Sequence, residues 1–185
     1  MTLGSLVRQM AVGVCVVVSL VMTPSRAFAQ ADSVEVSGGY SYLHETELSI
    51  PAGWYASGGG YLNSWLGIVG EVNGHYKTLS AAGVDVKTSI HLVGIGPKFA
   101  LRRNPRIAPY VQVLLGMGRT SVGVNALGDR FDTSINGFAY QPSAGVEFNG
   151  GGSVGLRVAV ARAAIHAENE WFGETMVMVG VVVRR

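Results

Sequence analysis

The sequence of 185 residues contains little cysteine, little charge and no long apolar segment beyond its N-terminal region. Its one cysteine, Cys15, lies near the start, so the rest of the chain offers no disulfide and no thiolate metal site. Lys, Arg, Asp and Glu make up 14% of the residues, against the usual ~25%. Apolar residues reach 48%, but 26 glycines and many polar residues interrupt them. This composition favours apolar side chains spaced singly along strands.

The N-terminal residues predict a secretory signal. Arg8 supplies a positive charge, and Met10–Met22 is an apolar segment of thirteen residues. That segment is shorter than the ~20 residues of a membrane-spanning helix. The motif Ala27-Phe28-Ala29 that follows is typical of a cleavage site. We therefore predict a signal peptide over residues 1–29 and one domain over residues 30–185.

Charge and residue spacing argue against nucleic acid and against a metal ion as partners. Without Arg8 and Arg26, the chain carries 12 basic and 12 acidic residues and no net charge. A nucleic-acid-binding domain normally shows a basic face, so we expect no nucleic-acid partner. His44, Glu45 and Glu47 could bind a cation, but three polar residues in an exposed loop are weak evidence. We expect no metal and no cofactor.

Apolar and polar residues alternate with a period of two along most of the chain. In Leu66–Lys77, for example, Ile68 and Val72 share one face, while Glu71 lies on the other. Eight segments of about ten residues show this pattern. They are Val34–Leu43, Trp54–Leu62, Leu66–Lys77, Lys87–Leu101, Ile107–Arg119, Asn136–Phe148, Ser153–Arg162 and Thr175–Arg184. The pattern predicts an all-β fold, a transmembrane antiparallel up-and-down β-barrel of about eight strands.

The connections between these segments alternate in length. The short ones lie near residues 63–64, 103–105 and 149–152, and the long ones near residues 44–53, 78–86, 120–135 and 163–173. Short periplasmic turns and longer extracellular loops are typical of outer-membrane barrels. We therefore expect loops at the outer end, and both chain termini at the inner end because the number of strands is even.

With this orientation, aromatic residues fall near the strand ends, where amphipathic rings prefer the membrane interfaces. The predicted aromatic girdle consists of Tyr40, Tyr42, Trp54, Tyr76, Phe138 and Tyr140 at the outer end and Trp65, Phe99 and Phe148 at the inner end.

Two prolines, Pro97 and Pro142, lie inside predicted strands. Proline cannot donate to the hydrogen-bond ladder, and a closed barrel has no free edge to accommodate it. We expect a β-bulge at each. At Pro97 the bulge would turn Lys98 inward and Phe99 and Leu101 toward the lipid.

The polar face places charged residues in the lumen. Glu35, Glu71, Glu147 and Arg157 share this face, and we predict that they form one ion-pair network. Buried charges must be paired, and eight strands enclose only enough space for their own side chains. The predicted result is a plugged polar lumen; the alternative is a minor ion path gated by these pairs. The pattern also allows other residues in the lumen, namely His75, His91, Lys98, Gln112 and Gln141.

These features resemble the small eight-stranded outer-membrane barrels, the OmpA-like and OmpX-like proteins. The resemblance is carried by Val34–Tyr42, Val93–Phe99, Pro109–Gly116 and the valine-rich last strand. It implies a location in the cell outer membrane and insertion by the barrel assembly machinery. It also implies a structural or surface-interaction role, as a monomer in contact with membrane lipid and lipopolysaccharide. Cations near the outer rim are candidate lipopolysaccharide contacts, namely Lys77, Lys87, Arg130 and Arg162.

Two other functions remain open on the sequence. One is a secreted soluble barrel that binds a small apolar ligand, with polar residues outward and apolar residues inward. The other is a lipid A-modifying enzyme that uses His166 beside Glu168 and Glu170 in a loop. No serine lies near this histidine, so we predict no catalytic residue and a non-enzymatic protein.

Overall fold

The computed structural model describes residues 34–44, 49–50, 52–81, 84–102, 104, 106–126, 129–150, 152–167 and 170–185. The predicted signal peptide lies outside these residues. Within them, no helix is long and apolar enough to cross a membrane.

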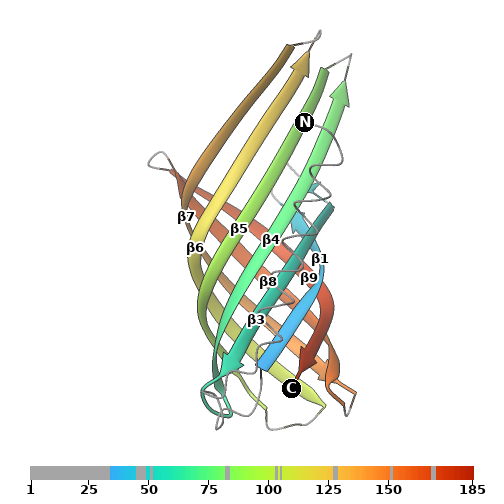
Figure 1. Ribbon diagram of the computed structural model, residues 1–185, viewed down its shortest axis with the longest axis vertical. Helices are drawn as coiled ribbons and strands as arrows, with labels where there is room; N and C mark the ends of the chain where they lie inside the picture. The colour runs from blue at the N-terminus through green and yellow to red at the C-terminus, as the bar shows by residue number, and fades with distance from the viewer. Residues whose placement is uncertain are drawn as a thin grey trace. The chain divides into compact units, whose positions relative to one another are not determined.

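The described chain forms nine β-strands that close into one barrel (Figure 1). The strands are β1 (Val34–His44), β2 (Ser49–Ile50), β3 (Ala52–Tyr61), β4 (Leu66–Ala81), β5 (Val84–Ala100), β6 (Ile107–Ala126), β7 (Asp129–Asn149), β8 (Val154–Ala167) and β9 (Glu170–Arg184). Neighbouring strands pair antiparallel, and β1 also pairs with β9. The short β2 pairs only with the end of β1. Eight long strands therefore make the barrel wall, which confirms the predicted fold.

The apolar side chains of the strands face outward. In β8, Leu156 and Val160 are 58% and 52% exposed, while the alternating Arg157 and Ala161 are buried. In β6 and β9, too, apolar side chains are exposed and the side chains that alternate with them are buried. Water would penalise such a surface, whereas lipid stabilises it. The soluble ligand-binding alternative required the opposite arrangement and is therefore wrong.

Three of the four predicted long loops are strand instead. Residues 78–81 and 84–86 belong to β4 and β5, and most of 120–135 belongs to β6 and β7. Residues 163–167 and 170–173 likewise extend β8 and β9. The pairing of β6 with β7 keeps one register from Ile107↔Phe148 to Ala126↔Asp129. Sequence analysis missed these extensions because strands beyond the lipid have no need of an apolar face.

The extensions leave part of the wall as an open sheet. Residue Phe138 is the outermost residue of β7 that pairs with β8, and Tyr76 is the outermost residue of β4 that pairs with β3. Beyond them, β4–β7 extend past the other strands at the top of Figure 1. We call residues 77–81, 84–91, 119–126 and 129–137 the projecting sheet. The segments of chain that run beyond the closed barrel are longest at this end. It is therefore the outer end, and the end with the C-terminus is the inner end.

Neither proline produces a bulge. The register between β5 and β6 is the same before and after Pro97, at Ile95↔Leu115 and Lys98↔Gln112. The β7–β8 register is likewise unchanged across Pro142. The predicted bulges are wrong because a one-residue shift would turn every following side chain to the other face. Losing the one ladder hydrogen bond that proline cannot donate costs less than such a shift. Simple alternation along β5 already turns Lys98 inward and Phe99 outward.

A close approach of β5 and β6 beside Pro97 depends on Gly96. A Cβ atom at Gly96 would lie 1.9 Å from the Val113 carbonyl oxygen, whereas a Cβ at Gly58 would meet nothing within 4 Å. We expect Gly96→Ala to destabilise the barrel by about 1–3 kcal/mol, because the strands must shift. Gly58→Ala should be neutral or stabilising. Urea unfolding of both variants in lipid vesicles checks this, and equal stability would contradict it.

Candidate functional site in the barrel lumen

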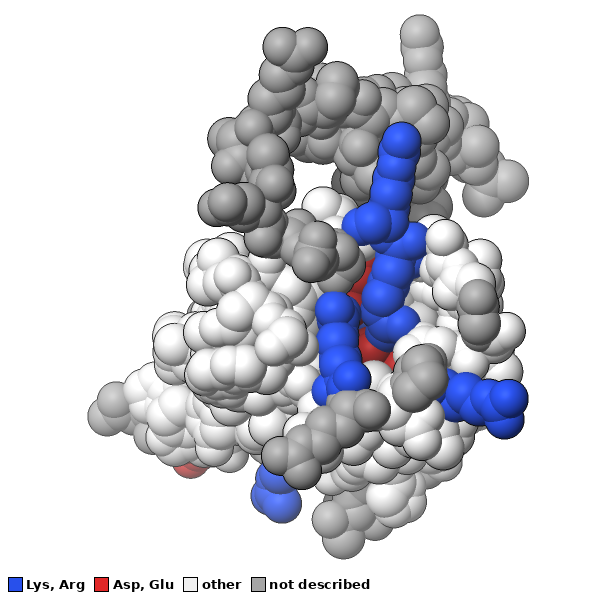
Figure 2. Space-filling model, turned by 90° about the horizontal axis from the view of Figure 1, so that it is seen from below, with Lys and Arg blue, Asp and Glu red and all other residues white. Residues whose placement is uncertain are grey.

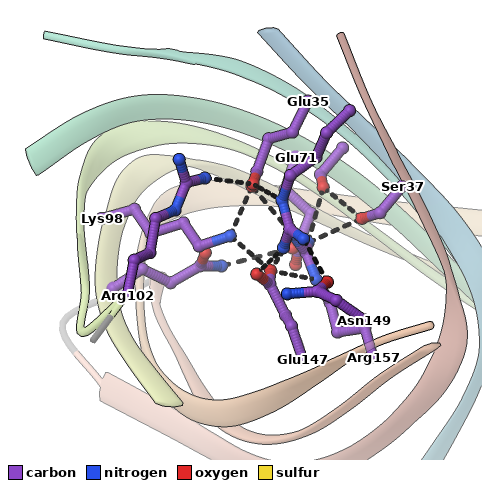
Figure 3. A network of polar contacts seen from close by, with 11 residues as sticks. Glu35, Ser37, Glu71, Lys98, Arg102, Glu147, Asn149 and Arg157 are labelled. Atoms are coloured by element: carbon purple, nitrogen blue, oxygen red, sulfur yellow. Dashed lines mark hydrogen bonds and ion pairs between the residues drawn. The ribbon is translucent and has the colours of Figure 1, made fainter. Parts of the chain in front are cut away.

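Charged side chains from five strands meet in the lumen near the inner end (Figure 3). Glu35 on β1 lies directly opposite Arg184 on β9, and Glu147 on β7 lies opposite Arg157 on β8. Lys98 reaches the same place from β5. The register of the closed sheet brings these residues together, although Glu35 and Arg184 lie near opposite ends of the described chain. We call these five residues the lumen cluster.

Arg157 lies at the centre of the lumen cluster. Its Nη2 atom donates to Glu35 Oε1 at 2.8 Å and to Glu147 Oε1 at 2.6 Å. Its Nη1 atom donates to the hydroxyls of Ser37 and Ser57 at 2.6 and 3.1 Å. The side chain is 2% exposed. A buried guanidinium is costly unless both charge and donors are matched, and here they are.

Lys98 supplies a second buried cation. It donates to Glu35 and, at 2.6 Å, to Glu147 Oε1. Its ammonium also lies 4.4 Å from the centre of the Tyr110 ring, whose π face attracts a cation. Sequence analysis left the facing of Lys98 dependent on Pro97, and the uninterrupted alternation of β5 places it inside.

Two further arginines lie at the inner mouth, and sequence analysis did not assign them to the lumen. Arg184 pairs with Glu147 and bonds to Asn149, and its Nε atom lies 3.6 Å from Glu35 Oε2. Arg102 lies 3.6 Å from the same oxygen and stacks 3.5 Å above the Tyr61 ring. Figure 2 looks into this end, where Lys and Arg side chains lie across acidic ones. Val183 belongs to the apolar face of the last strand, so alternation would have placed the next residue, Arg184, on the lumen side.

Glu71 does not join the ion pairs, contrary to the prediction of one network. Its two carboxylate oxygens accept from Gln141 Nε2 at 2.6 Å and Gln112 Nε2 at 3.3 Å. Asn73 in turn donates to Gln141 Oε1 at 3.0 Å. Alternation assigns a residue to a face but not to a depth, and Glu71 lies in a separate layer of amides.

Outward from the amide layer, the lumen contains a histidine and buried apolar side chains. His75 bonds to the Ser41 hydroxyl at 2.9 Å. Beyond Ser41, the outer end of β1 brings together the buried apolar side chains of Leu43, Ile50 and Met176. The lumen therefore changes along the barrel from ionic to amide and then to mainly apolar side chains, with Glu174 buried near the outer end.

The outer surface carries the aromatic residues predicted for the girdle. Eight are exposed, namely Tyr40, Trp54, Trp65, Tyr76, Phe99, Phe138, Tyr140 and Phe148, while Tyr42 is half-buried. Trp65 and Phe99 stack with ring centres 5.8 Å apart at the inner end. Trp171 and Phe172 are also exposed, and sequence analysis missed them by treating residues 163–173 as a loop.

The loop assigned to His166 is a strand. His166 belongs to β8 and Glu170 to β9, and the His166 ring lies 4.7 Å from the Trp171 ring. The side chain of Glu168 lies outside the described residues. Among the side chains that are described, no three of His, Cys, Asp and Glu group together as metal ligands would.

The four candidate lipopolysaccharide contacts do not form one patch. Lys77 and Lys87 lie on paired strands, but they face opposite sides of the sheet. Arg162 is exposed on β8, which pairs with neither β4 nor β5. The side chain of Arg130 lies outside the described part. A single lipid headgroup site therefore cannot contain all four residues.

A closed antiparallel barrel with an apolar outer surface and a charged interior defines a transmembrane β-barrel. The sequence profile of the outer membrane protein beta-barrel domain family matches residues 14–184, and the chain belongs to this family. Its location is the outer membrane of the Gram-negative cell envelope.

Solved structures show the same fold. Ail, the attachment invasion locus protein of Yersinia pestis, has a TM-score of 0.62 and 19% identity, covering 84% of this chain and all of that one. Neisserial surface protein A has a TM-score of 0.62 and 17% identity, covering 82% and 95%. The N-terminal barrel domain of Pseudomonas aeruginosa OprF has a TM-score of 0.56 and 12% identity, covering 84% and 100%. A comparison with curated protein sequences gave no match.

The different partners of Glu147 and Glu71 predict different costs of neutralisation. Glu147→Gln removes a charge that binds Arg157, Lys98 and Arg184, and we expect a loss of about 3–5 kcal/mol. Glu71→Gln, the matched control, should cost about 1 kcal/mol, because an amide can keep most of its hydrogen bonds. Urea unfolding in lipid vesicles measures both. A larger loss for Glu71→Gln would contradict this account of the lumen.

Proposed function

We propose that this protein is a non-enzymatic barrel that acts at the cell surface by binding other molecules and not by conducting ions. The observation that carries the proposal is the projecting sheet. Strands β6 and β7 contain 20 and 21 residues, whereas about 9–11 residues suffice to cross a bilayer. About half of each strand is therefore available outside the lipid.

The layered lumen supports the second half of the proposal. The lumen cluster lies at the inner end, the amides around Glu71 lie further outward, and buried aliphatic side chains lie near the outer end. Eight strands leave room for side chains but not for a wide water-filled channel. We infer a plugged lumen that gives the barrel stiffness.

The edges of the projecting sheet supply a means of binding. Among the described strands, residues 129–137 of β7 pair only with β6, and residues 77–81 of β4 pair only with β5. A strand edge of this kind carries unpaired N–H and C=O groups that can accept an extended segment of a partner. Ail is described as an attachment invasion locus protein, and a similar role at the surface accords with these edges.

The remaining expectations from the family resemblance form part of this proposal. The barrel assembly machinery would insert the chain, and the barrel would act as a monomer surrounded by lipid and lipopolysaccharide. Closure of β1 on β9 leaves no edge inside the membrane for pairing with a second copy, which supports a monomer.

Planar-bilayer recording tests the plugged lumen. We expect no steady conductance from the wild-type barrel if the lumen is plugged as proposed. Arg157→Ala should also stay closed, because the amide and apolar layers remain in place. A steady conductance in the wild type, or one that appears in Arg157→Ala, would support the alternative of an ion path gated by these pairs.

Shortening the projecting sheet tests the surface role. In the variant, residues 123–132 are replaced by Asn-Gly, which joins the paired residues Val122 and Thr133 through a tight turn. Cells that express the wild-type barrel should adhere to a host-cell layer several-fold better than cells without it. We expect the shortened barrel to lose this gain while it keeps its heat-dependent gel shift. Equal adherence of folded wild-type and shortened barrels would contradict the proposal.

A further inference from the structure

The outward face of β5–β7 changes from apolar to polar in one step. Val93, Met117 and Phe138 form a cross-strand row and are 53%, 60% and 51% exposed. The next outward-facing row consists of His91, Arg119 and Asn136. Side chains in hydrocarbon and in the headgroup region differ in this way, so the outer limit of the lipid tails lies between these two rows.

A hollow lies directly above this boundary on the same face. Its volume is about 320 Å³, and its lining includes Lys87, Ser89, Arg119, Ser121, Asp132 and Ser134. These residues come from three adjacent strands and occupy successive outward-facing rows. In one row Ser89 pairs with Ser121, which pairs with Ser134. In the next row Lys87 pairs with Gly123, which pairs with Asp132. Because Gly123 has no side chain, the Asp132 carboxylate can lie over it, with its Oδ1 atom 2.7 Å from the position of a Cβ at Gly123.

The lining has the chemistry of an anion site. Lys87 and Arg119 provide two positive charges, Asp132 provides one negative charge, and the net charge is positive. Arg119 Nη2 lies 3.4 Å from Ser134 Oγ, so the guanidinium already extends across the sheet toward the hydroxyls. Guanidinium, ammonium and hydroxyl donors together bind phosphate oxygens. The side chains of Lys87 and Arg119 are both exposed.

The position of the hollow indicates that the phosphate belongs to a lipid headgroup. It faces sideways from the barrel, one row above the last apolar side chains, at the depth where lipid headgroups lie. In the outer leaflet of this membrane those headgroups belong to lipopolysaccharide. We propose that the hollow binds a phosphate of lipopolysaccharide through Lys87 and Arg119, with Ser89, Ser121 and Ser134 donating further hydrogen bonds.

This site goes beyond the proposed surface role, because it uses the face of the projecting sheet and not its edges. It also replaces the predicted set of four lipopolysaccharide contacts. Lys87 is retained from that set, while Lys77 faces the other side of the sheet and Arg162 lies on β8. Arg119, which sequence analysis did not select, takes their place beside Lys87.

Binding of purified lipid A to the folded barrel in detergent micelles, counted by native mass spectrometry, tests the proposal. We expect the double variant Lys87→Gln/Arg119→Gln to bind diphosphorylated lipid A about tenfold more weakly than wild type, because two charge-assisted contacts are lost. Asp132→Asn should bind more tightly, since a like charge is removed. Arg106→Gln, which removes an exposed arginine at the inner end, is the matched control and should not change binding.

Two further ligands distinguish a lipid phosphate from the acyl chains of the lipid and from a free anion. Lipid A stripped of its phosphates should bind the wild type no better than it binds the double variant. Equal binding of intact lipid A by wild type and double variant, or weaker binding by Asp132→Asn, would overturn the proposal. Inorganic phosphate bound as tightly as lipid A would overturn the assignment to lipid. The gel shift reports folding of each variant, and adherence of the shortened barrel is scored separately, so this site and the surface role can fail independently.

Discussion

Closure of the hydrogen-bond ladder is the constraint on which the rest of this structure depends. Lipid offers no partner for a peptide group, so strands inside a membrane must pair on both sides. The pairing of β1 with β9, from Glu35↔Arg184 to His44↔Thr175, removes the last two edges. Once the sheet is closed, alternation sends one set of side chains to lipid and the other to the lumen. Beyond the lipid, where water is available, the outer residues of β4 and β7 pair with a single neighbour among the described strands.

The lumen cluster is a direct consequence of closure. The first strand contributes Glu35 and the last contributes Arg184, so the ion pairs join elements that are adjacent only after the barrel has closed. Charges enclosed in this way require partners, because an unpaired charge in a narrow interior is costly. Arg157 and Lys98 meet both Glu35 and Glu147. The outer hollow is different in kind, because Lys87 and Arg119 are exposed on the outward face of the sheet and are not enclosed in the lumen.

Particular residues show how far sequence analysis could reach. Alternation placed Glu35, Glu147 and Arg157 on the inner face, because side-chain facing is a local property of a strand. It did not separate Glu71 from them, because depth along the barrel depends on how neighbouring strands are staggered. Bulges at Pro97 and Pro142 were expected from the missing donor alone, whereas the structure keeps the register of whole strands.

By itself the sequence determined the class of protein, the number of long strands and the facing of most side chains away from the two prolines, since a period of two needs only the local backbone. The tertiary structure alone decided which inward residues meet, how far β4–β7 project and which polar residues lie just above the lipid. Those properties depend on the register between strands, and register is set only when the whole sheet pairs and closes.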